Sequence, residues 1–177
     1  MRYTTKYETP LGEVLLAADE KGLTGLWFDG AKHYAAGLDP QHEEKETPVF
    51  ETVRAWLELY FSGKKPDTLP PLHMIGSPFR CRVWEIMLQI PYGQTMTYGE
   101  LAGRIAKEKG IGHMSAQAVG GAVAHNPISI IIPCHRMVGA DGSLTGYAGG
   151  IPRKVELLKL EGAGMEKLFV PRQGTAL

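Results

Sequence analysis

The sequence predicts a two-domain protein of the α/β (α+β) class, and three observations support this. Strand-like runs alternate with turn residues over the first 28 residues, a proline-rich segment follows at 64–76, and the second half contains several short helical patterns. The chain has 177 residues, 44% of them apolar, which suits two small domains with packed cores. We predict an N-terminal domain with its linker over 1–76, a C-terminal domain over 77–162 and a tail over 163–177.

The N-terminal domain is predicted to contain a small sheet and one helix. Its turns and strands alternate as turn 9–12, strand 14–18, turn 19–22 and strand 23–28. The charged stretch 39–46 is predicted to be a solvated loop. Apolar residues recur at helical spacing over 49–61, where Ser62-Gly63 ends the helix, and the prolines of 64–76 mark the linker.

The C-terminal domain begins with an N-cap and a proline, Ser77-Pro78, and its first helix ends before Pro91. A second helix is predicted from about Thr97. A third is predicted from Ser115 to about His125. Strands with a hairpin at Gly142 and a closing helix over 152–161 follow, and this order is typical of a winged helix-turn-helix variant.

The segment Ile130–Arg136 reads Ile-Ile-Ile-Pro-Cys-His-Arg, an apolar, strand-like run that stops at a proline and presents a cysteine beside a histidine. A thiolate is a strong nucleophile, and a neighbouring base raises its fraction at neutral pH. The residues alone leave two interpretations open. Cys134 is either a nucleophile beside His135 or a small buried apolar residue.

Composition argues against several classes of protein. Two cysteines and the lack of a charged-then-apolar leader argue against a disulfide framework and against secretion. No apolar run approaches the ~20 residues that span a bilayer. The cysteines and six histidines form no C-x-x-C or H-x-x-x-H pair, so no metal site is expected. We expect a soluble, cytoplasmic protein without a membrane partner.

The formal net charge of zero hides an asymmetry between the two predicted domains. Residues 1–76 hold 8 Lys/Arg and 12 Asp/Glu, a net charge of −4, whereas residues 77–162 hold 9 and 6, a net charge of +3. The basic domain is the one with the Cys-His pair. It is only mildly basic, so any affinity for DNA should be modest and sensitive to salt.

The third predicted helix has almost no side-chain bulk. Its small residues are Ala116, Ala118, Gly120, Gly121, Ala122 and Ala124. Each glycine costs a helix ~1 kcal/mol relative to alanine, so the pattern needs a reason. One interpretation is close packing against a neighbouring element. The other is docking in a narrow minor groove without base-specific contacts, because a major-groove reader would carry Arg, Asn or Gln.

Four motifs at their observed spacings resemble the O6-alkylguanine-DNA alkyltransferases: Ser115–Pro127, Ile132–Arg136 (Ile-Pro-Cys-His-Arg), Gly146–Gly150 and Leu160–Gly162. The resemblance is strong over 77–162 and looser over 1–76, where it implies a small ribonuclease-H-like antiparallel sheet with a helix. It implies DNA repair by direct damage reversal, with irreversible, stoichiometric transfer of the alkyl group from O6-alkylguanine to a cysteine. No cofactor is implied, and activity on O4-alkylthymine stays open.

The resemblance also implies a role for each catalytic residue. Cys134 accepts the alkyl group, His135 deprotonates it through a bridging water, and Glu161 holds the other imidazole nitrogen. Asn126 is the hinge between the recognition helix and the active-site strand. From the residues alone, a capping or surface carboxylate is the better interpretation of Glu161, and Asn126 fits an ordinary helix stop before proline.

For DNA, the resemblance implies minor-groove docking of the third helix and extrusion of the damaged nucleotide. The implied helix contacts are Ser115, Ala116, Gln117, Ala118 and Gly121. The other implied roles are Tyr98 at the flipped base and its 3′ phosphate, Arg136 bracing the active-site turn, Met137 offering its carbonyl to the guanine amino group, Tyr147 beside the base, and the Ala148 amide near O6. The implied partner is double-stranded DNA carrying O6-alkylguanine, with single strands bound more weakly, and the protein should be a monomer.

The chain departs from the family at Gln117, where an intercalating arginine is usual. Glutamine can fill the stack but brings no charge to hold it. Other functions are less consistent with the sequence. A non-enzymatic lesion sensor of this type lacks the cysteine, and a cysteine hydrolase using Cys134, His135 and Glu161 needs a leaving group that a thioether does not offer. A winged-helix regulator without chemistry would not carry a glycine-rich reading helix.

Overall fold

The structure, a computed structural model, describes residues 1–171, so residues 172–177 of the predicted tail lie outside the described residues. The chain divides into two compact units. One comprises Met1–Ile75 together with the short segment Pro127–Ile131, and the other comprises Gly76–Asn126 with the chain from Ile132 on. The predicted domains did not include the return of 127–131 to the first unit.

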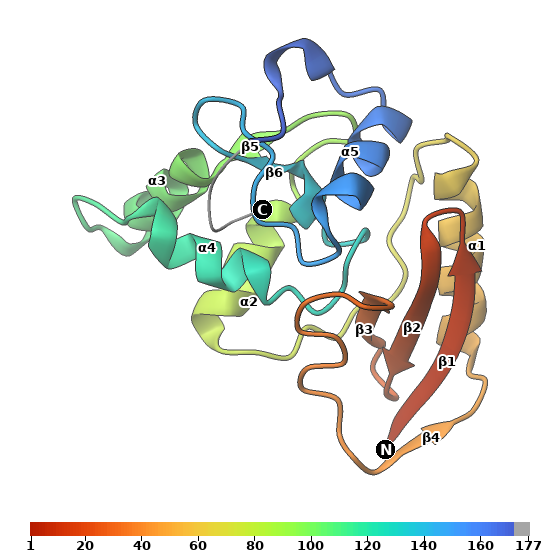
Figure 1. The fold of residues 1–177 in the computed structure, drawn as a ribbon. Coiled ribbons are helices and arrows are strands. Elements are labelled where there is room, and N and C mark those ends of the chain that lie inside the picture. The colour runs from red at the N-terminus through yellow and green to blue at the C-terminus, as the bar shows by residue number, and fades with distance from the viewer. Residues whose placement is uncertain (172–177) are drawn as a thin grey trace. The chain divides into compact units, whose positions relative to one another are not determined.

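The N-terminal unit contains a four-stranded sheet in the order β3-β2-β1-β4 (Figure 1). Its strands are β1 (Arg2–Thr9), β2 (Gly12–Ala18), β3 (Leu23–Phe28) and β4 (His42–Glu44). The first three pair antiparallel, as predicted, because each turn joins sequential strands. β4 runs parallel to β1. The solvated loop predicted over 39–46 is therefore wrong at its centre, where three exposed residues form a short, charged edge strand of the type that discourages further pairing.

Helix α1 (Pro48–Phe61) packs against β1 and β2 and confirms the helix predicted over 49–61 (Figure 1). It buries one apolar stripe, namely Phe50, Val53, Leu57 and Tyr60. The segment predicted as a linker, 64–76, is not free of the sheet. The amide of Leu23 donates to the carbonyl of Pro71, and the amide of His73 donates to the carbonyl of Leu23, so the end of this segment lies along β3.

Residues Pro127–Ile131 also pair with β3. The amide of Leu26 donates to the Pro127 carbonyl at 2.8 Å, and the amide of Ser129 donates to the Leu26 carbonyl at 3.0 Å. The pairing ends at Ile130, whose φ is +71°, in the left-handed region that a β-branched residue rarely adopts. The strand predicted for the apolar run from Ile130 is therefore wrong. Burial explains the apolar composition, and a short buried run does not specify its backbone conformation.

The C-terminal unit contains four α-helices among the described residues, and its parts are visible in Figure 1. The elements are α2 (Pro78–Met87), β5 (Met96–Thr97), α3 (Tyr98–Lys109), α4 (Ala116–Ala124), the 3₁₀ turn η1 (Cys134–Arg136), β6 (Met137–Val138), α5 (Ile151–Leu160) and the 3₁₀ turn η2 (Met165–Lys167). The caps predicted at Ser77 and Ser115 are present, and Thr97, near which a helix start was predicted, also caps its helix. Each hydroxyl accepts the backbone N–H three residues later. The predicted α+β class is confirmed.

The predicted hairpin at Gly142 is not formed by two paired strands. The amide of Gly139 donates to the Ser143 carbonyl and closes a tight turn. The strand before this turn, β6, pairs in parallel with β5, which lies earlier in the chain. Gly142 therefore lies in a turn, as predicted, but the turn does not join two strands that pair with each other. Across the described residues, no helix has the length and apolar character needed to cross a membrane.

Candidate active site

Cys134 opens η1 directly after Pro133 and is buried, with 6% of its surface exposed. Its amide donates to the carbonyl of Ile132 at 2.8 Å. Burial raises the pKa of the Cys134 thiol, and a hydrogen bond from Asn126 and the charge of Lys154 oppose that rise without cancelling it. The resting thiol is therefore protonated near neutral pH, and a base is needed before it can attack.

His135 and Glu161 form a buried pair, with His135 Nε2 2.6 Å from Glu161 Oε2 and neither side chain exposed. Although burial alone would raise the pKa of Glu161, the bonds and charges of His135 and Arg136 hold it well below its usual range. Glu161 is thus a carboxylate, which only accepts hydrogen bonds. The proton between the two groups must sit on Nε2, and Nδ1 keeps its lone pair.

The His135 imidazole is neutral at physiological pH. Burial lowers its pKa, and the neighbouring carboxylate only partly offsets this. Within residues 1–171, its Nδ1 atom is buried and has no hydrogen-bond partner. An unprotonated nitrogen without a hydrogen-bond partner, on the residue that follows a protonated thiol, is available to act as a general base.

Arg136 also contacts the Glu161 carboxylate, at both of its oxygens. Its Nε donates to Oε1 at 2.8 Å and its Nη2 to Oε2 at 3.0 Å, while Nη1 donates to the Ile90 carbonyl at 2.7 Å. The amide of Gly93 also donates to Oε1, at 3.0 Å. Such bidentate, charge-assisted contacts hold the carboxylate in one orientation. The bracing role predicted for Arg136 fits this geometry.

Asn126 follows α4 and is 93% buried, with 7% of its surface exposed. Its Nδ2 donates to the Ile132 carbonyl at 2.8 Å. That carbonyl also receives the amide of Cys134. Asn126 is therefore more than a helix stop, because its side chain joins the end of the helix to the residues that carry the cysteine.

The exposed side of α4 consists of the five residues predicted to face DNA, namely Ser115, Ala116, Gln117, Ala118 and Gly121. The opposite side is buried, and Trp84 Nε1 donates to the Ala122 carbonyl there at 2.9 Å. Among residues 1–171, a Cβ atom added at Gly120 or Gly121 would meet nothing within 4 Å. Close packing within these residues therefore does not explain the two glycines, and this side of α4 has little side-chain bulk apart from Gln117.

A cavity of about 410 Å³ adjoins α4 and α3 in the C-terminal unit, a size typical of small-molecule pockets. Three of the predicted DNA-contact residues line it, namely Tyr98, Ala116 and Gln117. The other lining residues are Gly99, Gly120, Ala124, Gly139, Ala140, Thr145 and Gly146. The Tyr98 hydroxyl donates to the Thr145 carbonyl at 3.3 Å, which ties the start of α3 to the loop between β6 and α5.

Met137, Tyr147 and Ala148 do not line this cavity. Met137 and Tyr147 are buried, and Ala148 is half-buried. The Met137 carbonyl, predicted to receive the guanine amino group, already accepts a hydrogen bond from the ammonium of Lys154. A carbonyl oxygen has a second lone pair, so this bond leaves room for the predicted contact.

Lys154 is the functional candidate that sequence reasoning missed. It lies on α5, is fully buried, and donates to the carbonyls of Met137 and Thr145. A lysine in a helix is normally taken as solvent-exposed. The signal was its spacing, because Lys154 shares the i, i+3, i+4 stripe of Leu157 and Leu158, the buried side of α5.

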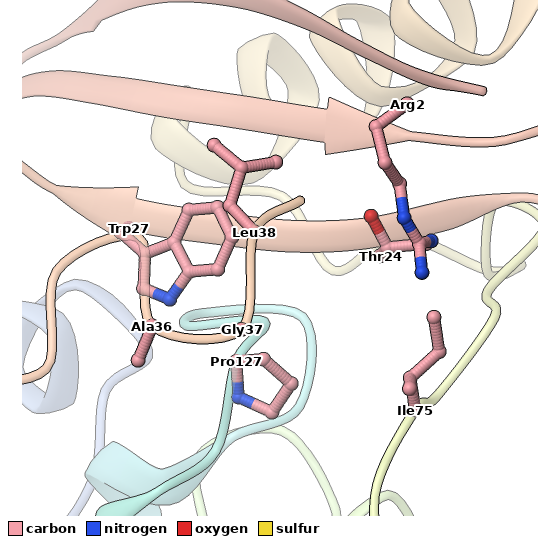
Figure 2. A pocket seen from close by; sticks show the side chains of 8 residues that line it. All are labelled: Arg2, Thr24, Trp27, Ala36, Gly37, Leu38, Ile75 and Pro127. Atoms are coloured by element: carbon pink, nitrogen blue, oxygen red, sulfur yellow. The ribbon is translucent and has the colours of Figure 1, made fainter. Parts of the chain in front are cut away.

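A second cavity lies in the N-terminal unit and measures about 60 Å³. Figure 2 shows Trp27, Leu38 and Pro127 around it, with the Arg2 side chain entering from β1. Arg2 is engaged by Asp19, at 3.0 Å. The cavity is far below the volume of small-molecule sites and holds only a few water molecules, so the chemistry belongs to the C-terminal unit.

Comparison with known protein families gives two matches. Residues 1–73 match the ribonuclease-like domain of 6-O-methylguanine DNA methyltransferase, and residues 78–163 match its DNA binding domain. The chain is also 42% identical over 160 residues to the methylated-DNA–protein-cysteine methyltransferase of Haemophilus influenzae, covering 90% of this chain and 86% of that one. The chain belongs to the 6-O-methylguanine DNA methyltransferase family.

Other members of the methyltransferase family are equally similar along their length. The Methanosarcina acetivorans methylated-DNA–protein-cysteine methyltransferase is 42% identical over 91% of this chain and 99% of its own. A crystal structure of the Mycobacterium tuberculosis protein OGT in complex with DNA superposes with a TM-score of 0.78 at 39% identity, covering 90% of this chain and 92% of that one. The predicted ribonuclease-like and winged-helix classes are thereby confirmed, and the methyltransferase match to 78–163 contains the whole Cys134–Glu161 site.

Among the described residues, no group of three or more His, Cys, Asp or Glu side chains could hold a metal ion.

Proposed function

We propose that this protein repairs DNA by moving the alkyl group of O6-alkylguanine irreversibly onto Cys134. The observation that carries the proposal is the buried pair formed by His135, which directly follows the cysteine, and Glu161. His135 is neutral, and its Nδ1 atom has no hydrogen-bond partner among residues 1–171. This pair supplies the base that the protonated thiol requires. The names of the most similar relatives, methylated-DNA–protein-cysteine methyltransferases, support the same reaction.

In the proposed mechanism, His135 takes the proton of Cys134 through a bridging water, and Glu161 stabilises the imidazolium that forms. The thiolate then attacks the alkyl carbon. An S–C bond forms, the C–O6 bond breaks, and its electron pair stays on the guanine oxygen. The proton held by His135 passes to the released base, which leaves the histidine neutral again. Asn126 supports the thiolate by hydrogen bonding.

We assign DNA docking to residues 77–162. The exposed side of α4, which has little side-chain bulk, enters the minor groove. The damaged nucleotide turns out of the duplex towards the cavity beside Tyr98. A helix whose glycines face open space can approach a narrow groove where side chains would collide. The relative crystallised with DNA supports this partner. Preference for double over single strands, action as a monomer, and the roles of Met137, Tyr147 and Ala148 at the base are further parts of the proposal.

The product limits the protein to a single turnover. A thioether on Cys134 has no good leaving group, and Cys81, the other cysteine, lies on α2 outside this site. A thiol that must stay reduced also fits a reducing cytoplasm. A cysteine hydrolase built on the same residues would turn over many times, so stoichiometry separates the two functions.

The test is intact-protein mass spectrometry after mixing limiting protein with excess methylated-guanine duplex. We expect repair to stop at one equivalent and a gain of one methyl group that maps to the Cys134 peptide. The variant Cys134→Ser should gain no methyl group, and Cys81→Ser should behave as the unmodified protein does. Many repair events per protein molecule, or methylation of Cys81, would disprove the proposal.

A further inference from the structure

Lys154 is fully buried, which is unusual for a group that carries a charge in water. Burial of an ammonium is costly unless its donors and its charge are both satisfied. Two of its donors reach backbone carbonyls, those of Met137 and of Thr145, the latter at 2.9 Å. The hydrogen bonds are therefore in place, and the charge remains to be explained.

The other buried charges of the site balance one another without Lys154. Glu161 forms a bidentate ion pair with Arg136 and also contacts His135. Within residues 1–171, Lys154 has no carboxylate partner. The group whose negative charge acts on Lys154 is Cys134, and the charge of Lys154 acts on Cys134 in return. The lysine thus has an electrostatic partner only when the cysteine is a thiolate.

Through the Met137 and Thr145 carbonyls, Lys154 is also linked to a residue that lines the cavity. Met137 belongs to β6, whereas Thr145 belongs to the loop that lines the cavity. The Thr145 carbonyl accepts from the Tyr98 hydroxyl as well. One ammonium therefore connects α5 with β6 and with the loop on which the wall of the cavity depends.

We propose that Lys154 is a positioning residue for alkyl transfer, whose buried ammonium balances the charge of the Cys134 thiolate and holds the cavity loop through the Met137 and Thr145 carbonyls. The inference rests on the proposed role of Cys134 as acceptor. The ammonium has a negative charge acting on it from Cys134 only in the thiolate state, and it loses that charge again in the neutral thioether product.

Burial lowers the pKa of Lys154 to about 8, and the charge of Cys134 opposes this. Titratable or charged groups on the surrounding elements include Tyr98 on α3, His135 and Arg136 on η1, and Glu161 at the end of α5. Arg153, Glu156 and Lys159 are the other charged residues of α5 itself. Thiolate formation at alkaline pH keeps Lys154 charged, and a thioether cannot ionise, so alkylation of Cys134 should lower the pKa of Lys154 further.

The experiment measures the thiolate without DNA, by the rate at which iodoacetamide alkylates Cys134 between pH 6 and 10. In that reaction the S–C bond forms, the C–I bond breaks, iodide leaves with the electron pair, and the thiol proton goes to solvent. Peptide mass spectrometry separates Cys134 from Cys81. Lys154→Met removes the charge, Lys154→Arg keeps it, and Lys159→Met, an exposed lysine of the same helix, is the matched control.

We expect Lys154→Met to move the pH profile of Cys134 upward by about one unit, which is about a tenfold loss of rate at neutral pH. Lys154→Arg should recover most of the rate, and Lys159→Met should match the unmodified protein. A Lys154→Met profile equal to that of Lys159→Met means that the lysine only fills space, and the proposal is wrong. Because iodoacetamide needs no lesion recognition, this result is independent of whether methylated DNA is repaired.

If Lys154→Met does not fold, the unmodified protein supplies the answer. The side-chain nitrogen and carbon signals of Lys154 are titrated by NMR before and after carbamidomethylation of Cys134. The pKa of Lys154 should fall on alkylation while that of Lys159 stays constant. An unchanged Lys154 titration overturns the proposal.

Discussion

The side-chain amide of Asn126 donates a 2.8 Å hydrogen bond to the carbonyl of Ile132, and so links the two residues that flank segment 127–131. That segment is paired with Leu26 of β3. The same Ile132 carbonyl accepts the amide of Cys134. The position of the cysteine backbone therefore depends on a single buried amide side chain.

Replacing Asn126 tests this dependence. Asn126→Asp keeps the shape of the side chain but removes its N–H donor. Asn126→Ala removes both the donor and the shape. Loss of a buried hydrogen bond costs about 1–3 kcal/mol when a partner is left unsatisfied. We expect both variants to lose stability in urea and to transfer the alkyl group more slowly in single-turnover assays. Gln94→Ala, which removes an exposed amide, should change neither quantity. Unchanged transfer in both Asn126 variants would mean that the amide does not position Cys134.

His135 and Glu161 should act on the same step. His135→Ala removes the base, and proton transfer by a positioned side chain contributes about 10²–10⁴-fold. The transfer rate should fall within that range while lesion binding stays nearly intact. The loss in His135→Ala/Glu161→Gln should be far smaller than the product of the single losses, since the two act as a unit. His135→Ala transferring at the unmodified rate at neutral pH would rule out the relay.

The buried pair also makes stability depend on acid. The pKa of Glu161 is lowered in the folded state, so its contribution is present above the unfolded pKa of about 4.5 and is lost as pH falls below it. The pKa of His135 is lowered too, so its contribution falls with pH below about 6.5.

Denaturation at a series of pH values should therefore show stability falling from pH 7 towards pH 3. Glu161→Gln should reduce stability at pH 7 and flatten the part of the curve below pH 5. Glu156→Gln, an exposed acid of the same helix, should leave the curve in place. A curve for Glu161→Gln parallel to that of the unmodified protein would contradict the linkage.

Local signals predicted much of this fold because they act within a few residues. Ser77-Pro78 and Ser115 specify helix starts by capping, and the structure has helices there. The path of Ile130–Ile132 could not be read in the same way. Its apolar residues indicate burial, but the left-handed Ile130 depends on tertiary pairing that the sequence does not display.

The site divides in the same manner. Cys134, His135 and Glu161 could be predicted as site residues because their spacing resembles that of the alkyltransferases. The structure brings His135 and Glu161 into contact. Lys154 could not be marked by residue type, because lysine is rarely buried and its partners are backbone carbonyls that carry no sequence signature.

Gln117 is exposed on α4 and lines the cavity, at the position where the resemblance leads us to expect an arginine. A neutral hydrogen bond contributes about 1 kcal/mol, against ~1.5–3 kcal/mol for a charged one. Gln117→Arg should therefore bind alkylated duplex more tightly, by roughly twofold to thirtyfold in fluorescence anisotropy. Gln117→Gly should weaken duplex repair, and both effects should shrink on single strands. Equal effects on single and double strands would show that Gln117 does not enter the stack.

Gly121 offers the sharpest contrast between folding and docking. Gly121→Ala should stabilise α4 by up to about 1 kcal/mol, since the added methyl group meets nothing within 4 Å in the described part of the chain. The same methyl group should weaken DNA binding if this side of α4 enters the minor groove. Gly103→Ala, at an open helical position on α3, should gain stability without that loss. Undiminished DNA binding by Gly121→Ala would remove α4 from the interface.

The open space around Gly120 and Gly121 has a consequence for how this chain can change over generations. Selection for thermal robustness alone would favour alanine at both positions, because no neighbouring atom of residues 1–171 would resist the added methyl group. Contacts within these residues therefore give no reason for two adjacent glycines in a nine-residue helix. Heat-stabilised variants obtained by screening without DNA should accumulate substitutions here first, and should be checked for repair before any use.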